Sequence, residues 1–311
     1  MESTPTMQQF LTRTMKSKLR TILFAALMLM GAGAARASAC DDLHKQLCSL
    51  TDTFPARVGI AVTTHTGESL QINGNVPFAM LSVMKLPQAM AVVDALRQSR
   101  TSLWSSVDVT PAELAPNTWS PLRNRHPRGG EFAIAQLLEY SLQLSDNNAC
   151  DILFSRVADV AQVDAYVKSL GIEDCNIAYT EAQMNADVSR CYDNSITPLA
   201  AVKLMQTLFE QRNADRYSRF LWRTMSDCRT GANRIPRLIA DRVLSVTHKT
   251  GTGPLTADGK ITAVNDVGCI VLDGNRHCHI AVFISDARCS MAQCEALIAK
   301  VAQLCVDALS Q

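Results

Sequence analysis

Segments with the composition of β-strands lie near both ends of this chain, and a long helical pattern separates them. They are residues 57–63 and 69–72 near the front, and residues 243–248, 267–272 and 277–285 near the back. Thr66-Gly67 makes a turn inside the front pair, and Asp273-Gly274 is a strong tight-turn signal inside the back group. Because strands need partners, the pattern predicts one sheet assembled from both chain ends.

The middle of the chain has apolar residues at helical spacing. The expected helices are residues 84–96, 134–142, 148–157, 163–170 and 199–209, and residues 291–309 form an amphipathic helix at the end. The sequence therefore predicts an α+β fold, in which an antiparallel sheet with flanking terminal helices receives an all-helical lobe. The predicted parts of this one domain are an α/β lobe at 40–80 and 230–311 and a helical lobe at 81–229, after a leader at 1–39.

The N-terminal segment has the pattern of a signal peptide. Lys16, Lys18 and Arg20 precede an uncharged apolar run over residues 21–35, and Ala37-Ser38-Ala39 fits the small-residue rule for cleavage before Cys40. The run is shorter than the roughly 20 residues that a membrane-spanning helix needs. We expect a periplasmic or secreted protein, with lipid attachment at Cys40 as the less favoured alternative and Met15 as an alternative start.

Charge and cysteine content exclude several classes of function. Lys and Arg number 30 against 29 Asp and Glu, so nothing points to nucleic acid or an anionic lipid surface. All eleven cysteines follow the leader, where an exported chain can form disulfides, and at least one of them has no partner within the chain. Cys and His are not clustered at zinc-ligand spacing. We therefore expect no metal and no cofactor, and the cysteine pairing stays open.

The first candidate for chemistry is Ser82-Val83-Met84-Lys85, placed where the strand region gives way to a helix. Three residues are nearly one helical turn, so Lys85 lies over Ser82 and can take its hydroxyl proton. Free N–H groups at a helix start also favour an oxyanion beside the nucleophile. Taken alone, a capping serine with a surface lysine is the better explanation.

Two further motifs follow in the chain. Ser145-Asp146-Asn147 opens a helix, and Lys249-Thr250-Gly251-Thr252-Gly253 follows a Val-rich strand. Separately, the first is a routine helix cap and the second a turn at a strand end. All three motifs in this order and at these intervals are shared by the penicillin-recognising serine enzymes.

From about Cys40 onward the chain resembles the class A serine β-lactamases, and it looks closest to their extended-spectrum and Bacteroides-type cephalosporinase branch. Glu181-Ala182-Gln183-Met184-Asn185 is similar to the Glu-x-x-x-Asn of that family. The resemblance implies hydrolysis of the β-lactam amide of penicillins and cephalosporins through a serine acyl-enzyme, which confers antibiotic resistance.

The resemblance also implies a role for each catalytic residue. Ser82 is the implied nucleophile, Lys85 helps to deprotonate it, and Ser145 relays a proton to the leaving nitrogen. Glu181 is implied in the release of the acyl-enzyme by water, and whether Lys85 or Glu181 is the acylation base stays open.

The remaining implied residues bind the substrate or the water. Lys249 and Thr250, in one motif with Gly251 and Thr252, bind the substrate carboxylate with help from Arg234. Asn147 holds the side-chain amide of the antibiotic, Asn185 helps to hold the water, and the N–H groups of Ser82 and Thr252 form the oxyanion hole. Trp119 stands where the family has an aromatic residue bordering the pocket, although a plain core or surface tryptophan is an alternative. His248 is expected to be a strand-end residue rather than a catalyst.

The sequence departs from the family pattern in the loop that carries the glutamate. Tyr179 and Asn194 stand where the best-known members have an Arg–Asp ion pair, and Ala182 stands where many have a proline after a cis bond. We therefore expect the loop to be held differently. Leu81 and Gly253 stand where the class A carbapenemases have a disulfide, which disfavours carbapenem hydrolysis.

Two alternatives share the three motifs. A penicillin-binding DD-peptidase ordinarily lacks the glutamate and asparagine found here at Glu181 and Asn185, and a non-hydrolysing β-lactam sensor comes attached to transmembrane segments. Both are therefore less favoured. The expected partners are small-molecule β-lactams alone, and the family is usually monomeric. The preferred antibiotic and the oligomeric state are not encoded in any motif of this sequence.

Overall fold

The structure is a computed structural model that describes residues 40–310 of the 311. It divides into two compact units, Met1–Gln46 and Leu47–Gln311. In the first unit the described residues 40–46 are helical, and the predicted leader at 1–39 lies outside the described residues. Among the described residues, none of the helices combines the length and the apolar character needed to span a bilayer. The architecture below belongs to the second unit.

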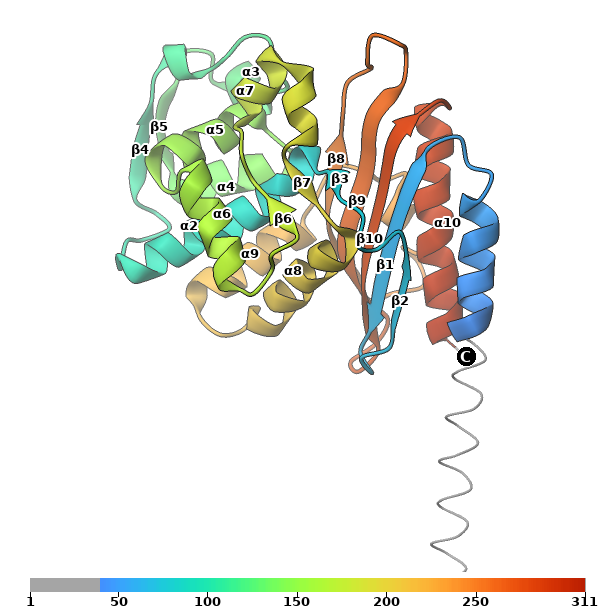
Figure 1. The fold of residues 1–311 in the computed structure, drawn as a ribbon. Helices are drawn as coiled ribbons and strands as arrows, with labels where there is room; N and C mark the ends of the chain where they lie inside the picture. The colour runs from blue at the N-terminus through green and yellow to red at the C-terminus, as the bar shows by residue number, and fades with distance from the viewer. Residues whose placement is uncertain (1–39, 311) are drawn as a thin grey trace, which may run out of the picture. The chain divides into compact units, whose positions relative to one another are not determined.

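A five-stranded antiparallel sheet joins the front of the chain to its back, in the order β2-β1-β10-β9-β8 (Figure 1). Its strands are β1 (Arg57–Thr64), β2 (Ser69–Ile72), β8 (Ser245–Thr252), β9 (Ile261–Val271) and β10 (His277–Ala287). Strand β1 pairs with β10 along its whole length, for example with Ala61 opposite Ala281. The predicted sheet from both chain ends is confirmed.

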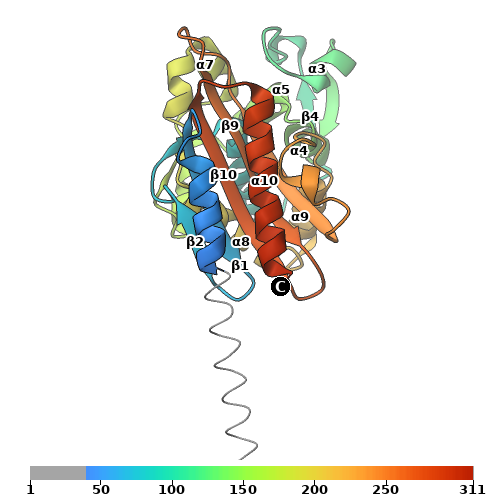
Figure 2. The ribbon, with the colours of Figure 1, turned by 90° about the vertical axis from the view of Figure 1, so that its right-hand side faces the viewer.

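Helices cover the two faces of this sheet. Helix α10 (Met291–Leu309) lies on one face, and the helices from the middle of the chain lie toward the other (Figures 1 and 2). Strand β9 runs between them and is buried at nearly every position. A strand covered on both faces has apolar residues at consecutive rather than alternating positions, as in the run from Cys269 to Val271.

The middle of the chain packs around α2 (Lys85–Gln98), which contacts α4, α5, α6 and α9 and is buried along most of its length. The other helices there are α3 (Pro121–Arg125), α4 (Ile134–Gln143), α5 (Asn147–Arg156), α6 (Val160–Ser169), α7 (Glu181–Ala186), α8 (Pro198–Gln211) and α9 (Arg216–Ser226). The most buried helix therefore begins at the lysine of the Ser-x-x-Lys motif.

The segment predicted to be all-helical also contains short strands. They are β4 (Ser106–Val109) and β5 (Gly130–Ala133) in a two-stranded sheet, and β6 (Cys175–Asn176) and β7 (Ser195–Ile196) in a small sheet with β3 (Phe78–Ala79). Runs of two to four residues are too short to show a period in the sequence. Helix α8 packs on β1, β9 and β10, so the helical segment is in direct contact with the sheet. The lobe boundaries stay a prediction.

Strand β8 differs from its prediction in a way that positions the site. The sequence predicts a strand at 243–248 that ends before the Lys-Thr-Gly motif, whereas the strand runs from Ser245 to Thr252 and contains the motif. Lysine, threonine and glycine are not typical of a buried strand, which is why the pattern ends early. The motif residues therefore have fixed, alternating directions on a paired strand.

Candidate active site

Ser82 lies on a single 3-10 turn, η1 (Leu81–Met84), which runs directly into α2. Leu81 before it adopts a left-handed backbone with φ 48°, a conformation that costs a non-glycine residue on the order of 1–3 kcal/mol. The turn brings Lys85 Nζ to 2.7 Å from Ser82 Oγ. The contact expected from the three-residue spacing is present, although a 3-10 turn rather than the α-helix itself carries the serine.

This turn is held tightly against strands β8 and β9. Asn265 Nδ2 donates to the carbonyl oxygens of Ala79 at 2.8 Å and Met80 at 3.2 Å. Gly251 lies on the other side, where a Cβ atom would come 2.4 Å from Met80 O. Only glycine therefore lets β8 approach the turn this closely, which gives Gly251 a packing role beside the nucleophile.

Lys85 is fully buried and surrounded by oxygen atoms. Besides Ser82 Oγ, its Nζ donates to Glu181 Oε1 at 2.5 Å, to Asn147 Oδ1 at 2.7 Å and to Ser145 O at 3.3 Å. A buried ammonium is costly unless it is paired and hydrogen-bonded, and these contacts supply both. Ser82 Oγ also lies 3.5 Å from Glu181 Oε1. The nucleophile is thus joined to two groups that can hold its proton.

Ser145 and Lys249 form a second polar pair beside this cluster. Ser145 has a left-handed backbone with φ 56°, and its Oγ accepts from Lys249 Nζ at 2.9 Å. Lys249 is fully buried, so burial first and then the charge of Lys85 lower the pKa of its ammonium to about 7. Lys249 can therefore gain or lose a proton near neutral pH.

Glu181 begins α7, and Asp151 on α5 holds the start of this helix. The two carboxylate oxygens of Asp151 accept from the backbone N–H groups of Glu181 and Ala182, both at 2.8 Å. Burial and then the charge of Glu181 raise the pKa of Asp151 to about 6. Sequence reasoning missed Asp151. Its one signal is a spacing of four residues from Asn147, which places both on one side of α5.

The other end of the same loop is held by a neutral side chain. Buried Asn194 accepts from Tyr179 N at 2.9 Å and donates to Tyr179 O at 2.8 Å. Tyr179 and Asn194 cannot form an Arg–Asp ion pair, as the sequence indicates. Hydrogen bonds between the Asn194 amide and the backbone of Tyr179 hold this end of the loop instead. Every peptide bond among the described residues is trans, including the one before Ala182.

Comparison with known proteins shows to which family the chain belongs. Residues 42–309 match the model of the β-lactamase enzyme family. The chain belongs to the β-lactamase family. It is 35% identical over 281 residues to a β-lactamase of Bacteroides uniformis, covering 89% of this chain and 95% of the relative. It is also 35% identical over 292 residues to the extended-spectrum β-lactamase PER-1 of Pseudomonas aeruginosa, covering 92% and 94%.

Solved β-lactamases share the fold as well. A class A β-lactamase from Bacteroides cellulosilyticus superposes with a TM-score of 0.82 at 33% identity, covering 87% of this chain and 98% of that one. The TLA-1 extended-spectrum β-lactamase gives a TM-score of 0.84 at 32% identity, with 88% and 100% covered. This protein is a class A serine β-lactamase that hydrolyses penicillins and cephalosporins, the activity behind resistance. The predicted family, fold class and enzyme activity are confirmed.

The β-lactamase places Arg234 directly behind the Lys-Thr-Gly-Thr strand. Its Nη2 donates to Thr252 Oγ1 at 2.7 Å, and its Nη1 donates to the carbonyl oxygens of Gly251 at 3.1 Å and Asn265 at 2.9 Å. A 3.3 Å contact from Nε to Glu295 pairs its charge. Arg234 is nearly fully buried, so its positive charge acts on the end of β8 rather than on open solvent.

The segment from Asn117 to Trp119 connects the two asparagines of the predicted site. Thr118 Oγ1 accepts from Asn147 Nδ2 at 2.7 Å, and Asn117 O accepts from Asn185 Nδ2 at 3.0 Å. Trp119 is 62% exposed and its indole N–H donates to Leu144 O, so it is not a core residue. Asn147 lies inside the Lys85 cluster, whereas Asn185 bonds to this bordering segment.

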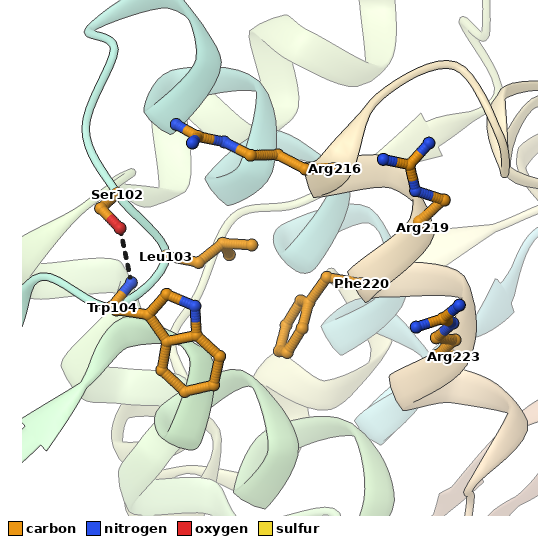
Figure 3. Close-up of a pocket in the computed structure, with 7 residues that line it drawn as sticks. All are labelled: Ser102, Leu103, Trp104, Arg216, Arg219, Phe220 and Arg223. Atoms are coloured by element: carbon orange, nitrogen blue, oxygen red, sulfur yellow. Dashed lines mark hydrogen bonds between the residues drawn. The ribbon is translucent and has the colours of Figure 1, made fainter.

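A surface pocket of about 320 Å³ lies at α9 and the segment before β4 (Figure 3). Trp104 and Phe220 line it together with the arginines of α9, Arg216, Arg219 and Arg223. It shares no residue with the Ser82 cluster, so it is not the hydrolytic site. Within residues 40–310, no group of three or more His, Cys, Asp or Glu side chains is placed to hold a metal ion.

Proposed function

We propose that Ser82 opens the β-lactam ring as the nucleophile and that Glu181 drives the hydrolytic second half of the reaction. The observation that carries this proposal is the position of Lys85 Nζ, 2.7 Å from Ser82 Oγ and 2.5 Å from Glu181 Oε1. One buried ammonium thus links the hydroxyl that must lose a proton to the carboxylate that can receive it.

In the first half, Ser82 Oγ attacks the carbonyl carbon of the strained amide, and its proton moves toward Glu181. The proton can cross the 3.5 Å to Glu181 Oε1 directly, or Lys85 can pass one of its own protons to Glu181 and take the serine proton. Both routes end on the same carboxylate oxygen. The backbone N–H groups of Ser82 and Thr252 stabilise the oxyanion, and one such donor is worth about 3–4 kcal/mol in other enzymes.

Breaking the C–N bond leaves a nitrogen that needs a proton. Ser145 Oγ gives this proton, and Lys249 Nζ, 2.9 Å away, replaces it. Because the pKa of Lys249 is about 7, the replacement is close to balanced at neutral pH. The proton then returns to Lys249 from solvent.

The substrate carboxylate binds at the end of β8. Lys249 and the hydroxyl of Thr250 contact it directly, and Arg234 adds a positive charge from behind the strand through Thr252. Trp119 borders the antibiotic side chain, whose amide bonds to Asn147. Cationic residues on a rigid strand fix the anion before the reaction begins.

In the second half, Glu181 first releases the proton from Ser82 to solvent. A water molecule then attacks the ester carbonyl while the Glu181 carboxylate takes the proton of that water. The bond from the carbonyl carbon to Ser82 Oγ breaks, and the serine oxygen takes its proton back from Glu181. Asn185, one turn after Glu181 on α7, orients the water. The α7 helix is fixed at its start by Asp151, which keeps the carboxylate in place for this step.

The test is hydrolysis of one penicillin and one cephalosporin by the wild type and by Ser82→Ala. We expect turnover of both to fall by on the order of 10⁴-fold or more, with the circular dichroism spectrum unchanged. Chelation with EDTA should leave the wild type active, because no step uses a metal. Near-normal turnover by the variant, or EDTA inactivation that zinc reverses, would contradict the proposal.

The spectrum of the enzyme is proposed from its relatives. Because PER-1 and TLA-1 carry the name extended-spectrum β-lactamase, we propose that cephalosporins with large side chains are substrates. Because Leu81 and Gly253 stand where a carbapenemase disulfide is expected, we propose that carbapenems are poor substrates. Measured kcat/KM values for a bulky cephalosporin and a carbapenem test this order. A carbapenem preferred over the cephalosporin would reverse it.

We also propose export, cleavage before Cys40 and action in the periplasm as a monomer on small-molecule β-lactams. The support is the leader pattern and the absence of any step that needs a second chain. Intact mass of the active periplasmic protein should begin at Cys40, and light scattering should give one chain. Retention of residues 1–39 would contradict cleavage, and a lipid on Cys40 would favour the anchored alternative.

A further inference from the structure

Behind the carboxylate-binding strand lies a Cys–His–Asp cluster that the hydrolytic mechanism does not use. His248 lies within β8 rather than at its end as predicted, and it is buried. Its Nδ1 is 2.9 Å and 3.0 Å from the two carboxylate oxygens of Asp266 on β9. The side chains of Cys228 and His248 are close enough to interact electrostatically.

Cys228 is also connected to the substrate site through hydroxyl groups. Its Sγ lies 3.4 Å from Thr230 Oγ1, which lies 2.6 Å from Thr250 Oγ1. The space between these residues is tight, since a Cβ atom at Gly231 would lie 2.4 Å from Thr250 Cγ2. Cys228 itself is a free, half-buried cysteine. A group attached to its sulfur would therefore press on Thr230 and Thr250.

The charges around the thiol favour its thiolate form. Burial alone would raise the pKa of Cys228, but the interaction with His248 and the charge of Lys249 lower it to about 7. Burial opposes the charged form of His248 too, yet the charge and hydrogen bond of Asp266 raise its pKa to about 10. The thiolate is the nucleophilic form of cysteine, and a pKa near the ambient pH is optimal for disulfide exchange.

The thiolate and Lys249 influence each other. Burial and the charge of Lys85 lower the pKa of Lys249, whereas the charges of Cys228, Glu181 and Asp266 oppose this lowering. Removing the negative charge at Cys228 would lower the pKa of Lys249 further. At neutral pH a smaller fraction of Lys249 would then carry the charge that binds the carboxylate.

We propose that Cys228 is a covalent modification site for small disulfide-type reagents, and that its modification weakens substrate binding by Lys249 and Thr250. The thiolate attacks one sulfur of the reagent, a new S–S bond forms, and the old bond from that sulfur breaks with its electron pair on the leaving group. The attached group neutralises Cys228 and crowds Thr230. The effect on hydrolysis rests on the proposed roles of Lys249 and Thr250, whereas the attachment does not.

Attachment is tested with methyl methanethiosulfonate, whose methylthio group transfers to the thiolate as methanesulfinate leaves. The mature protein is labelled briefly between pH 5 and pH 9, and non-reducing peptide mass mapping gives the rate at each cysteine. We expect Cys228 to be labelled with a half-maximal rate near pH 7. Replacement of His248 by Gln should move this midpoint toward the value of an ordinary thiol, about 8.5. If the His248→Gln variant does not fold, the pH profile of the labelling rate in the wild type tests the proposal by itself.

The effect on hydrolysis is tested on the same samples. We expect labelling to lower kcat/KM about tenfold, mainly through KM, as for the loss of one charge-assisted contact. The alkaline limb of the kcat/KM profile should move to lower pH, and dithiothreitol should restore both. Cys228→Ser should lose the sensitivity, whereas Cys289→Ser, which removes another half-buried cysteine next to Cys294, should keep it.

Two results would overturn the proposal. Absence of a Cys228 adduct, or labelling only above pH 8.5, would show that the His248–Asp266 pair does not activate the thiol. A full adduct with unchanged kcat/KM would show that the thiol is reactive but not coupled to substrate binding. Neither result affects the hydrolytic assignment, because the untreated enzyme and Ser82→Ala test that assignment separately.

Discussion

Two fully buried lysines lie in this site, and their partners give them different properties. Lys85 faces the carboxylate of Glu181, which balances its charge. Lys249 faces the hydroxyl of Ser145 and the carbonyl oxygen of Thr250, which are neutral. The pKa of Lys249 therefore falls to about 7, first because of burial and then because of the charge of Lys85.

At the residue scale this predicts a pH dependence. Lys249 is protonated below pH 7 and loses its charge as the pH rises through about 7, so kcat/KM for a carboxylate-bearing substrate should fall over that range. Stopped-flow or initial-rate measurements from pH 5 to pH 9.5 give the profile. Lys249→Arg should remove this limb, because arginine stays charged. A wild-type profile that stays flat to pH 9 would place the charged group elsewhere.

At the element scale, the sequence predicts the helices and strands that have a periodic apolar pattern. It misses the elements whose position depends on contacts with distant segments. The sheet from both chain ends, the β9–β10 hairpin and α10 follow from apolar patterns that packing on the sheet enforces. Helix α9 is absent from the predicted set, although Tyr217, Leu221 and Met225 recur at helical spacing and are buried. Its arginines interrupt the apolar composition on which the prediction relied.

The residues of the candidate site also divide into those that the sequence predicts and those that it misses. Local spacing predicts the contact between Ser82 and Lys85, because one helical turn separates them. Ser145 and Lys249 are predicted only through the resemblance of their motifs to the family, since their contact joins positions 104 residues apart. Asp151 and the hydrogen bond of Asn194 to Tyr179 join segments far apart in the chain, so no local pattern contains them. His248 lies within a strand because β8 continues through polar residues that bond across the sheet.

Asp151 provides the prediction at the element scale. Asp151→Asn leaves one acceptor oxygen for two N–H groups at the start of α7, so we expect a loss of about 1–3 kcal/mol in the free energy of unfolding. Deacylation should also slow, because Glu181 is the first residue of α7. Urea titration and single-turnover kinetics measure the two effects.

Asp159→Asn is the matched control, because Asp159 caps α6 through Gln162 N at 2.8 Å and does not hold α7. Asparagine caps a helix about as well as aspartate, so this variant should change stability little and should not slow deacylation. Equal deacylation rates in both variants would mean that Asp151 does not position Glu181.

At the scale of the whole molecule, the Cys228–His248 pair predicts how stability depends on pH. The pKa of His248 rises from 6.5 to about 10 on folding, so its stabilisation is complete below pH 6.5 and is lost as the pH rises through 10. The pKa of Cys228 falls from 9.0 to about 7, so its stabilisation is complete above pH 9 and is lost as the pH falls through 7. Between pH 7 and pH 9 the two slopes oppose each other.

Cys228→Ser removes the pH dependence of stability that comes from the thiol and leaves the one that comes from His248. The free energy of unfolding of the variant, relative to the wild type, should therefore fall between pH 7 and pH 9, by at most about 1.4 kcal/mol per pH unit. Urea unfolding at several pH values in this range measures the difference. A difference that is constant or grows in favour of the variant would show that His248 and Cys228 do not form an ion pair in the folded protein.

The central claim is that one carboxylate, Glu181, turns a β-lactam acceptor into a hydrolase. The most direct measurement is time-resolved intact mass of the wild type and Glu181→Gln mixed with a cephalosporin. In the variant Lys85 no longer faces the carboxylate that holds it as an ammonium, so a neutral Lys85 can serve as the base for acylation at Ser82. Glutamine cannot take the proton of the attacking water. General-base help is typically worth about 10²–10⁴-fold. We predict a transient adduct in the wild type and a persistent adduct on Ser82 in the variant. Equal release of product by the two proteins, or a wild type that never releases it, would contradict the account.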